Sequence, residues 1–175
     1  RRLRRLPRAD WGKATAHGGL GVTMAGIAGL MAWAVDDIRV AQLEEPFDVG
    51  SYTLTLHNVS EERGPNYLTT IAELSLAQDG KTIATLRPEK RFYPVAQMPT
   101  TEAAIDYNLA RDVYVVIGDA QDGGGWAVRT YIKPMTNWIW IGCALMALGG
   151  VLSLSDRRFR IAAGARKQPA GVPAE

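Results

Sequence analysis

One histidine lies inside a long uncharged run, and its side chain is the one in this sequence best placed to do chemistry. His17 falls in the run 14–35, which carries no charged residue. An ionisable side chain in such an apolar segment is costly, so a functional role is the first hypothesis for it. A neutral imidazole is a common ligand of metals and of haem iron. His17 is therefore a candidate axial ligand of a haem.

The helical neighbours of His17 leave two interpretations open. Three, four, seven and eight positions further along a helix stand Leu20, Gly21, Met24 and Ala25. This face of mostly small side chains forms a groove against which a flat macrocycle could lie. The alternative is helix packing, because the glycines of this run let a neighbouring backbone approach closely and His17 could bond across that interface. These glycines are Gly18, Gly19, Gly21, Gly26 and Gly29.

Two runs are long enough to cross a membrane. At 1.5 Å per residue, the run 14–35 makes a helix of roughly 33 Å, which matches the hydrocarbon core of a bilayer. A second uncharged run covers 135–155 and is only slightly shorter. We therefore expect two transmembrane helices, at 14–35 and 135–155.

The distribution of charge predicts the orientation of these helices. Residues 1–13 carry six basic side chains and one acidic side chain, and the tail 156–175 carries five basic side chains. The segment between the helices, 36–134, carries nine basic and fifteen acidic side chains. By the positive-inside rule, both terminal basic segments lie in the cytoplasm of a bacterium and the central domain lies in the periplasm.

The central domain has the pattern of a small all-β fold. Residues 51–57 alternate apolar and polar side chains, as a half-buried strand does. An Asp-Gly pair at 79–80 separates two further strands and predicts a hairpin turn. Strands at 112–118 and 126–132 complete a compact antiparallel barrel or sandwich. The segment 99–103 reads as a turn or a helix start capped by threonine.

The other candidate residues give weaker evidence of a functional site. His57 ends a strand with no ligand partner nearby in the sequence, so an exposed histidine at a loop edge is expected. Cys143, in the second apolar run, is expected to be a buried packing residue. The segment 87–94 could pair its basic side chains with carboxylates such as haem propionates, but its composition favours a solvated connection between strands. The sequence shows no Ser/His/Asp set, metal cluster or P-loop, and the acidic domain offers no surface for nucleic acid.

Several strings resemble the C-terminal region of the CcmF/NrfE family of cytochrome c-type biogenesis proteins, the haem lyases of System I. The strings run in one order over nearly the whole chain. They are Ala16-His17, 64–67, 87–95, 98–105, 111–114, 126–129, 133–134, 138–140, 146–150 and 156–158.

The resemblance implies a function. Such proteins lie in the cell inner membrane and help attach haem covalently to the Cys-x-x-Cys-His motif of apocytochrome c in the periplasm. Haem arrives on the chaperone holo-CcmE, and CcmH and CcmI-like subunits present the apocytochrome. Members of the family also hold their own haem b between two transmembrane histidines. The role of this haem is reduction of the incoming haem iron, and a quinol is a further partner. His17 matches the second of those histidines.

Much of the family's machinery is missing from these residues, namely the tryptophan-rich motif, the periplasmic histidines and the other haem b ligand. We therefore expect a C-terminal part of a longer protein, or a separately encoded piece, that is not catalytic alone. Gly18-Gly19 is also smaller than the residues expected after the ligand. The alternative function is a non-catalytic, membrane-anchored docking module for apocytochrome, haem chaperone or partner subunits. A lyase for nitrite-reductase cytochromes shares the motifs and is a third reading.

Overall fold

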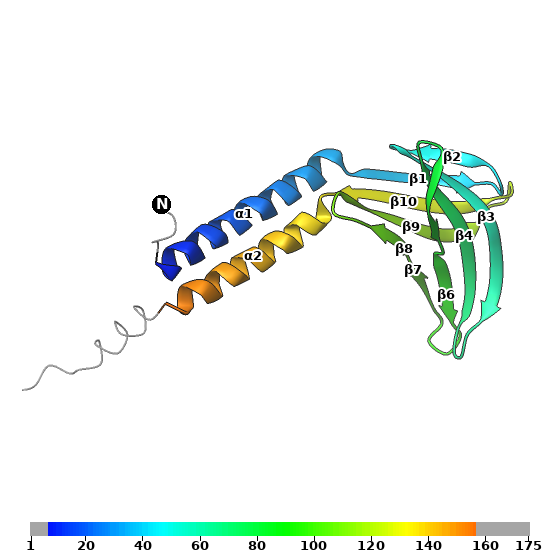
Figure 1. Cartoon of the computed structure of the whole chain (residues 1–175). Coiled ribbons are helices and arrows are strands. Elements are labelled where there is room, and N and C mark those ends of the chain that lie inside the picture. Colours follow the sequence, from blue (N-terminus) through cyan, green and yellow to red (C-terminus); the bar gives the residue numbers. More distant parts are fainter. Residues whose placement is uncertain (1–6, 157–175) are drawn as a thin grey trace, which may run out of the picture. The chain divides into compact units, whose positions relative to one another are not determined.

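The structure is a computed structural model that describes residues 7–156, and these form two compact units (Figure 1). A helical unit contains residues 7–27 and 138–156, and a sandwich unit contains residues 28–137. Of the predicted basic segments 1–13 and 156–175, residues 1–6 and 157–175 lie outside the described residues. The elements are α1 (Arg8–Trp33), β1 (Val35–Ala41), β2 (Pro46–Val49), β3 (Tyr52–Arg63), β4 (Leu68–Gln78), β5 (Lys81–Leu86), β6 (Glu89–Tyr93), β7 (Met98–Glu102), β8 (Ala104–Tyr107), β9 (Arg111–Ala120), β10 (Trp126–Pro134) and α2 (Thr136–Leu154).

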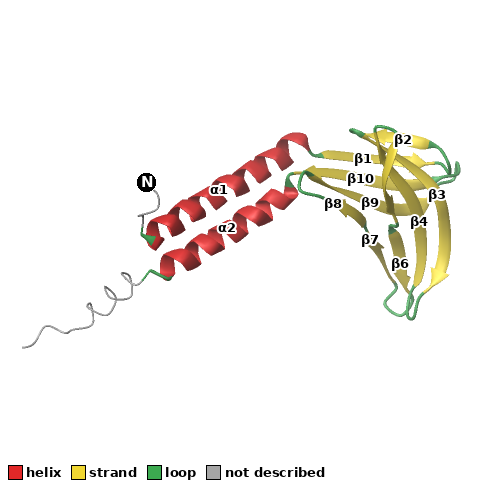
Figure 2. Ribbon diagram, viewed as in Figure 1, coloured by secondary structure: helices red, strands yellow, loops and turns green. Residues whose placement is uncertain are grey.

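The sandwich unit consists of two antiparallel sheets, which confirms the sandwich form of the predicted all-β domain (Figure 2). One sheet has the strand order β1-β10-β9-β8. The other has the order β2-β3-β4-β6-β7, with β5 paired to β4. The predicted Asp-Gly hairpin is present between β4 and β5, where Asp79 and Gly80 both have positive φ (51° and 73°). Two successive residues with positive φ are what a tight type I′ hairpin requires.

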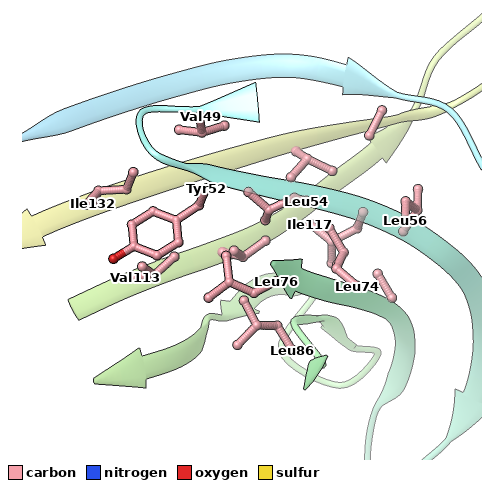
Figure 3. Packing of buried hydrophobic residues seen from close by; sticks show 14 residues of the cluster. Val49, Tyr52, Leu54, Leu56, Leu74, Leu76, Leu86, Val113, Ile117 and Ile132 are labelled. Atoms are coloured by element: carbon pink, nitrogen blue, oxygen red, sulfur yellow. The ribbon is translucent and has the colours of Figure 1, made fainter. Parts of the chain in front are cut away.

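The core lies between the sheets and is built by the alternation of side chains along the strands (Figure 3). Leu54 and Leu56 on β3 face Leu74 and Leu76 on β4 through the register of the two strands, and all four are fully buried. The facing sheet contributes alternate residues of β9 and β10, namely Val113, Val115, Ile117, Val128 and Ile132. Burial on one face of each strand fixes the pairing register, because a shift of one residue would turn the leucines toward solvent.

Replacing Leu74 with alanine is expected to lower the free energy of unfolding of the sandwich by about 2–5 kcal/mol, as large-to-small changes at fully buried sites do. Leu68→Ala is the matched control on the same strand, since Leu68 is 47% exposed. The measurement is a urea titration of both variants followed by the β-sheet circular dichroism signal. Equal midpoints for the two variants would contradict the core assignment.

At one end of the sheet that contains β3 and β4, apolar side chains are only partly covered by the rest of the sandwich. Its far part consists of β4 residues 68–71 paired to β6, and of β6 paired to β7. A bulge in β3 between Leu56 and Asn58 precedes this far part. Leu68 and Phe92, which pair across it, remain 47% and 36% exposed. This uncovered surface has no counterpart in the predicted compact domain.

The prediction of a turn or helix start at 99–103 is wrong, because these residues belong to β7 and the approach to β8. Pro99 pairs with Phe92, and Thr100 pairs with Arg91. Proline is tolerated there because β7 is an edge strand, where a missing N–H breaks no inner ladder. β-Branched threonines fit the pleated surface of a strand as well as they fit a helix cap.

The helical unit is an antiparallel pair packed through glycines. A Cβ added to Gly12 would lie 2.6 Å from the carbonyl oxygen of Gly149, and a Cβ added to Gly19 would lie 2.6 Å from that of Gly142. The two helices therefore touch backbone to backbone at points seven residues apart, a spacing that keeps one seam of each helix facing its partner. At the end of the pair, Asp156 accepts a hydrogen bond of 3.1 Å from the Ala9 N–H and caps the first turn of α1.

Among the described residues, one helix, α2, is long and apolar enough to cross a membrane. α1 covers most of the predicted run 14–35 but is rich in glycine, which lowers its mean hydropathy while permitting close packing. Both segments are helical, and membrane crossing remains a prediction for both.

Candidate functional site

His17 lies on α1 with one ring nitrogen occupied by the helix itself. Its Nδ1 is 2.8 Å from the backbone carbonyl oxygen of Lys13, one turn earlier. A carbonyl oxygen only accepts, so Nδ1 carries the proton and donates it. When the ring carries its proton on Nδ1 alone, Nε2 keeps a lone pair, and a hydrogen bond from the other ring nitrogen is the usual device that orients a metal-binding histidine.

The imidazole points away from the glycine seam between the helices. Gly12 and Gly19 are buried against α2, whereas His17 is exposed. A Cβ added to Gly18 or Gly21, one and four positions after His17, would meet no atom of a neighbouring element within 4 Å. The glycines thus divide between the two interpretations. Gly19 packs against α2, whereas Gly18 and Gly21 lie on a face that is open.

The face of α1 that carries His17 is open and apolar. Exposed apolar side chains continue along it, with Leu20 at 49% and Met24 at 62% exposure. A flat, apolar ring could lie over the two open glycines while Nε2 of His17 reaches its iron. The described residues contain no group of three or more His, Cys, Asp and Glu side chains able to hold a metal ion. A single imidazole beside an open face is the kind of group that can serve as one axial ligand of a haem.

His57 differs from His17 in its location and in the partners of its ring. It lies beside the bulge in β3 and its side chain is 40% exposed, so the expected exposure is present although the residue is inside a strand. Its Nδ1 is 3.1 Å from both carboxylate oxygens of Glu44, and its Nε2 is 2.9 Å from Oγ of Ser75. Both ring nitrogens are therefore engaged. Local spacing does not reveal these partners, because only the fold brings residues 13 and 18 positions away to the ring.

At the centre of the segment 87–94, the positive charge of Arg91 already has partners within the protein and is not available to a carboxylate ligand. Most of it is β6, and the guanidinium of Arg91 stacks on the Tyr67 ring at 4.8 Å from the centroid. Arg91 also pairs with Glu89 at 2.8 Å and Glu102 at 3.5 Å. The hydrogen bond to Glu89 raises the pKa of Arg91. These contacts favour a structural role over haem propionate binding.

Cys143 was expected to be a buried packing residue, and that expectation is wrong for the described structure. Its side chain is exposed on α2. The packing seam of α2 passes instead through the neighbouring Gly142. A step of one residue turns a helix by about 100°, so Cys143 leaves the seam that Gly142 occupies.

A second candidate site is a groove on the uncovered part of the sandwich, which we call the distal groove. It has a volume of about 530 Å³. Leu68, Phe92 and Pro99 form an apolar row across three neighbouring strands of its floor. Charged side chains line its sides, among them Glu61, Arg63 and the ion pair of Lys90 with Asp119. An apolar floor with polar sides is typical of a surface that binds a ligand or a protein segment.

A third feature ties the turn between β8 and β9 to the first residues of α2. The Nδ2 of Asn137 donates to the carbonyl oxygen of Asn108 at 2.8 Å and to Oδ1 of Asp112 at 2.9 Å. Asp112 is buried, and burial raises its pKa above the usual value of 3.8, against the lowering effect of Asn137 and of the charge on Arg111.

The raised pKa of Asp112 predicts a pH effect. On acidification, the folded chain takes up this proton at a higher pH than the unfolded chain does. Stability measured against the Asp112→Asn variant should therefore increase as the pH falls through the raised pKa and level off below about 3.8. Urea midpoints of both proteins between pH 7 and pH 3.5 check this. A stability of the parent relative to the Asp112→Asn variant that stays constant, or that decreases as the pH falls, would contradict the assignment.

Comparisons with known proteins agree with the fold. Residues 32–134 match the family model described as the CcmF C-terminal beta-sandwich. The chain is 62% identical over 166 residues to the cytochrome c-type biogenesis protein ccl1 of Rhodobacter capsulatus, covering 95% of this chain and 25% of that protein. It is 43% identical over 159 residues to the cytochrome c-type biogenesis protein CcmF of Haemophilus influenzae, covering 90% of this chain and 24% of that one.

A solved structure shares the fold. The cytochrome c heme lyase CcmF aligns with a TM-score of 0.65 at 22% identity, over 85% of this chain and 25% of that chain. The chain thus spans about a quarter of the length of the relatives that it matches. The family model covers more than half of the chain and lies on the sandwich described above. This chain belongs to the CcmF family, of which it represents the C-terminal region.

Proposed function

We propose that this chain is the C-terminal part of a membrane haem lyase subunit that works in cytochrome c maturation. In this role, α1 and α2 cross the bacterial inner membrane with both termini in the cytoplasm, and the sandwich lies in the periplasm. His17 supplies one axial ligand to a resident haem b, and the second ligand belongs to another part of the full-length protein. Covalent attachment of haem to apocytochrome c takes place outside these residues.

The two helices and the charge distribution support this topology. α2 has the length and apolar composition of a membrane span, and the uncharged part of α1 packs on it closely through glycines, as membrane helices often do. The basic terminal segments and the acidic central domain follow the positive-inside rule.

One observation carries the ligand assignment: Nδ1 of His17 donates to the Lys13 carbonyl beside two glycines that leave the face open. The hydrogen bond fixes the tautomer and the ring plane, so Nε2 is presented without further rearrangement. Gly18 and Gly21 keep side chains away from the position that a macrocycle would occupy. A bound haem b would supply one-electron transfer, and this chain would hold and orient it.

Complementation tests this function. In cells that lack the full-length gene, the protein with His17→Ala should fail to restore c-type cytochromes, scored by covalent haem staining, whereas His57→Ala should restore them. The level of the variant protein is checked by immunoblot. Full restoration by a normally expressed His17→Ala protein would contradict the proposal.

The distal groove favours a second function, which is docking of apocytochrome c. An apocytochrome is an extended chain before it receives haem, and such a chain can place apolar side chains on the row formed by Leu68, Phe92 and Pro99. The ion pair of Lys90 with Asp119 offers both signs of charge at the side of the groove. The resemblance names holo-CcmE, CcmH and CcmI-like subunits as other partners.

A charge placed on the groove floor tests docking. Phe92→Arg should reduce site-specific cross-linking of apocytochrome c to the full-length protein at least about tenfold, since an unpaired charge in an apolar contact is strongly unfavourable. Ile83→Arg is the matched control, because Ile83 is 45% exposed on β5 and does not line the groove. Equal cross-linking of the two variants would contradict docking here and would leave the haem assignment unaffected.

A further inference from the structure

An exposed apolar stripe runs along β8 into the turn that follows it. Ile105, Tyr107 and Leu109 stand at alternate positions, and their side chains are 47%, 73% and 69% exposed. β8 is an edge strand of its sheet. Alternate residues of a strand share one face, so Ile105 and Tyr107 of β8 project together, and Leu109 follows them in the turn.

Hydrogen bonds within the turn hold the conformation of the segment that carries the stripe. Oδ1 of Asn108 accepts hydrogen bonds from the N–H groups of Ala110 and Arg111, at 2.8 and 2.9 Å. The Asn108 N–H donates to the Arg111 carbonyl at 2.9 Å. The exposure of Tyr107 and Leu109 is therefore a property of an ordered turn, in which the two side chains are held outward.

The turn lies beside the beginning of α2. The carbonyl of Asn108 accepts from Asn137, and the carbonyl of Ala110 accepts from the Met135 N–H at 2.8 Å. α2 begins at Thr136, directly between these two donors, and is the described helix with the length and hydropathy of a membrane span. Trp138 and Trp140 follow within its first turns, and tryptophan is enriched where a helix enters the headgroup region.

The chemistry of the turn suits a low-dielectric surface. Its backbone N–H and C=O groups at Asn108 and Ala110 have protein partners, so none of these four must seek water. The two ionised side chains of the segment, Asp106 and Arg111, form an ion pair with each other. Arg111 is also held by the hydroxyl of Tyr52 at 2.9 Å. The turn thus presents an apolar tip with no uncompensated charge.

We propose that the β8–β9 turn inserts Tyr107 and Leu109 into the interfacial layer of the lipid bilayer, at the boundary between headgroups and acyl chains. The inference rests on the proposed function only in that α2 must cross the membrane. Tyrosine at such an interface places its ring in the apolar region and its hydroxyl among the headgroups, and the leucine side chain contacts the acyl chains. The turn then acts as a second point of attachment, which fixes the sandwich at the surface next to the entry of α2.

Depth-dependent quenching tests this in the full-length protein, reconstituted in phosphatidylcholine–phosphatidylglycerol vesicles. Native cysteines, including Cys143, are replaced by serine, and one cysteine at a time is introduced and labelled with an environment-sensitive nitrobenzoxadiazole probe. The test positions are Tyr107→Cys and Leu109→Cys. Val95→Cys is the matched control, because Val95 is 98% exposed on the turn between β6 and β7. Trp140→Cys reports on α2.

The expected result is blue-shifted emission at positions 107 and 109, with quenching by a doxyl lipid labelled near the headgroup that is at least half of that at position 140, and no quenching at 95. Quenching at 140 but not at 107 or 109 overturns the inference and leaves the membrane span intact. A blue shift without quenching also overturns it, because a protein segment then covers the turn. Absence of quenching at position 140 would show that α2 does not cross the membrane, which would contradict both the proposed topology and the insertion of the turn.

Discussion

Full-length protein that carries His17→Ala should lose its b-type haem absorbance. In the reduced spectrum, the α band of haem b is expected to fall by more than about tenfold per protein, because removal of even an outer-shell partner of a metal ligand typically costs 10- to 100-fold in affinity. The reason is local: Nε2 of His17 is the ring nitrogen left available by the hydrogen bond to Lys13.

Two matched controls separate ligation from other effects. His57→Ala removes the only other histidine of this chain and should leave the haem band unchanged, since both ring nitrogens of His57 are engaged by Glu44 and Ser75. Lys13→Ala removes a side chain but keeps the carbonyl to which His17 donates, so it should also retain the band. A normal band in the His17→Ala protein would show that the ligands lie elsewhere.

The second large effect concerns the glycine seam. Gly19→Leu should destabilise the helix pair by about 1–3 kcal/mol or more, because its Cβ would lie 2.6 Å from the Gly142 carbonyl oxygen and 2.7 Å from the Met146 N–H nitrogen. Both are backbone atoms, which cannot rotate away as the end of a side chain can. The expected result is a lower aggregation temperature of the full-length protein in detergent.

Adjacent glycines on each helix provide the controls for this prediction. A Cβ at Gly18 or Gly150 would meet no atom within 4 Å, so leucine at either position should leave the aggregation temperature near that of the parent. Gly149→Leu, one residue from Gly150, should act like Gly19→Leu. Gly18→Leu also fills the face beside His17, so haem content should fall in this variant although the helix pair remains stable. Equal behaviour of Gly18→Leu and Gly19→Leu in both measurements would be evidence against the two separate faces of α1.

Local pattern was sufficient for much of the sandwich. Alternation along β3 and the Asp-Gly pair at 79–80 each specify a structure within a few residues, and both predictions are confirmed. The wrong assignment at 99–103 arose because threonine and proline suit both a helix start and an edge strand. Only the long-range pairing with β6 decides between them.

The candidate sites divide in the same way. His17 could be selected from sequence because a charge-free run surrounds it, but the sequence did not distinguish Gly18 from Gly19, which differ only in the side of the helix that they occupy. The partners of His57 and the row of Leu68, Phe92 and Pro99 come from separate strands. Neither arrangement has a signature in local spacing.

Rescue by imidazole tests whether His17 is the ligand of the haem iron. In the full-length protein, His17→Gly removes the ring and leaves a space beside the already open Gly18 and Gly21. We expect this variant to lose the six-coordinate, low-spin spectrum of the resident haem, and we expect added imidazole to restore that spectrum in a saturable manner. His57→Gly should keep the low-spin spectrum without imidazole. A His17→Gly protein that retains the low-spin spectrum with no added imidazole would contradict the assignment of His17 as the ligand.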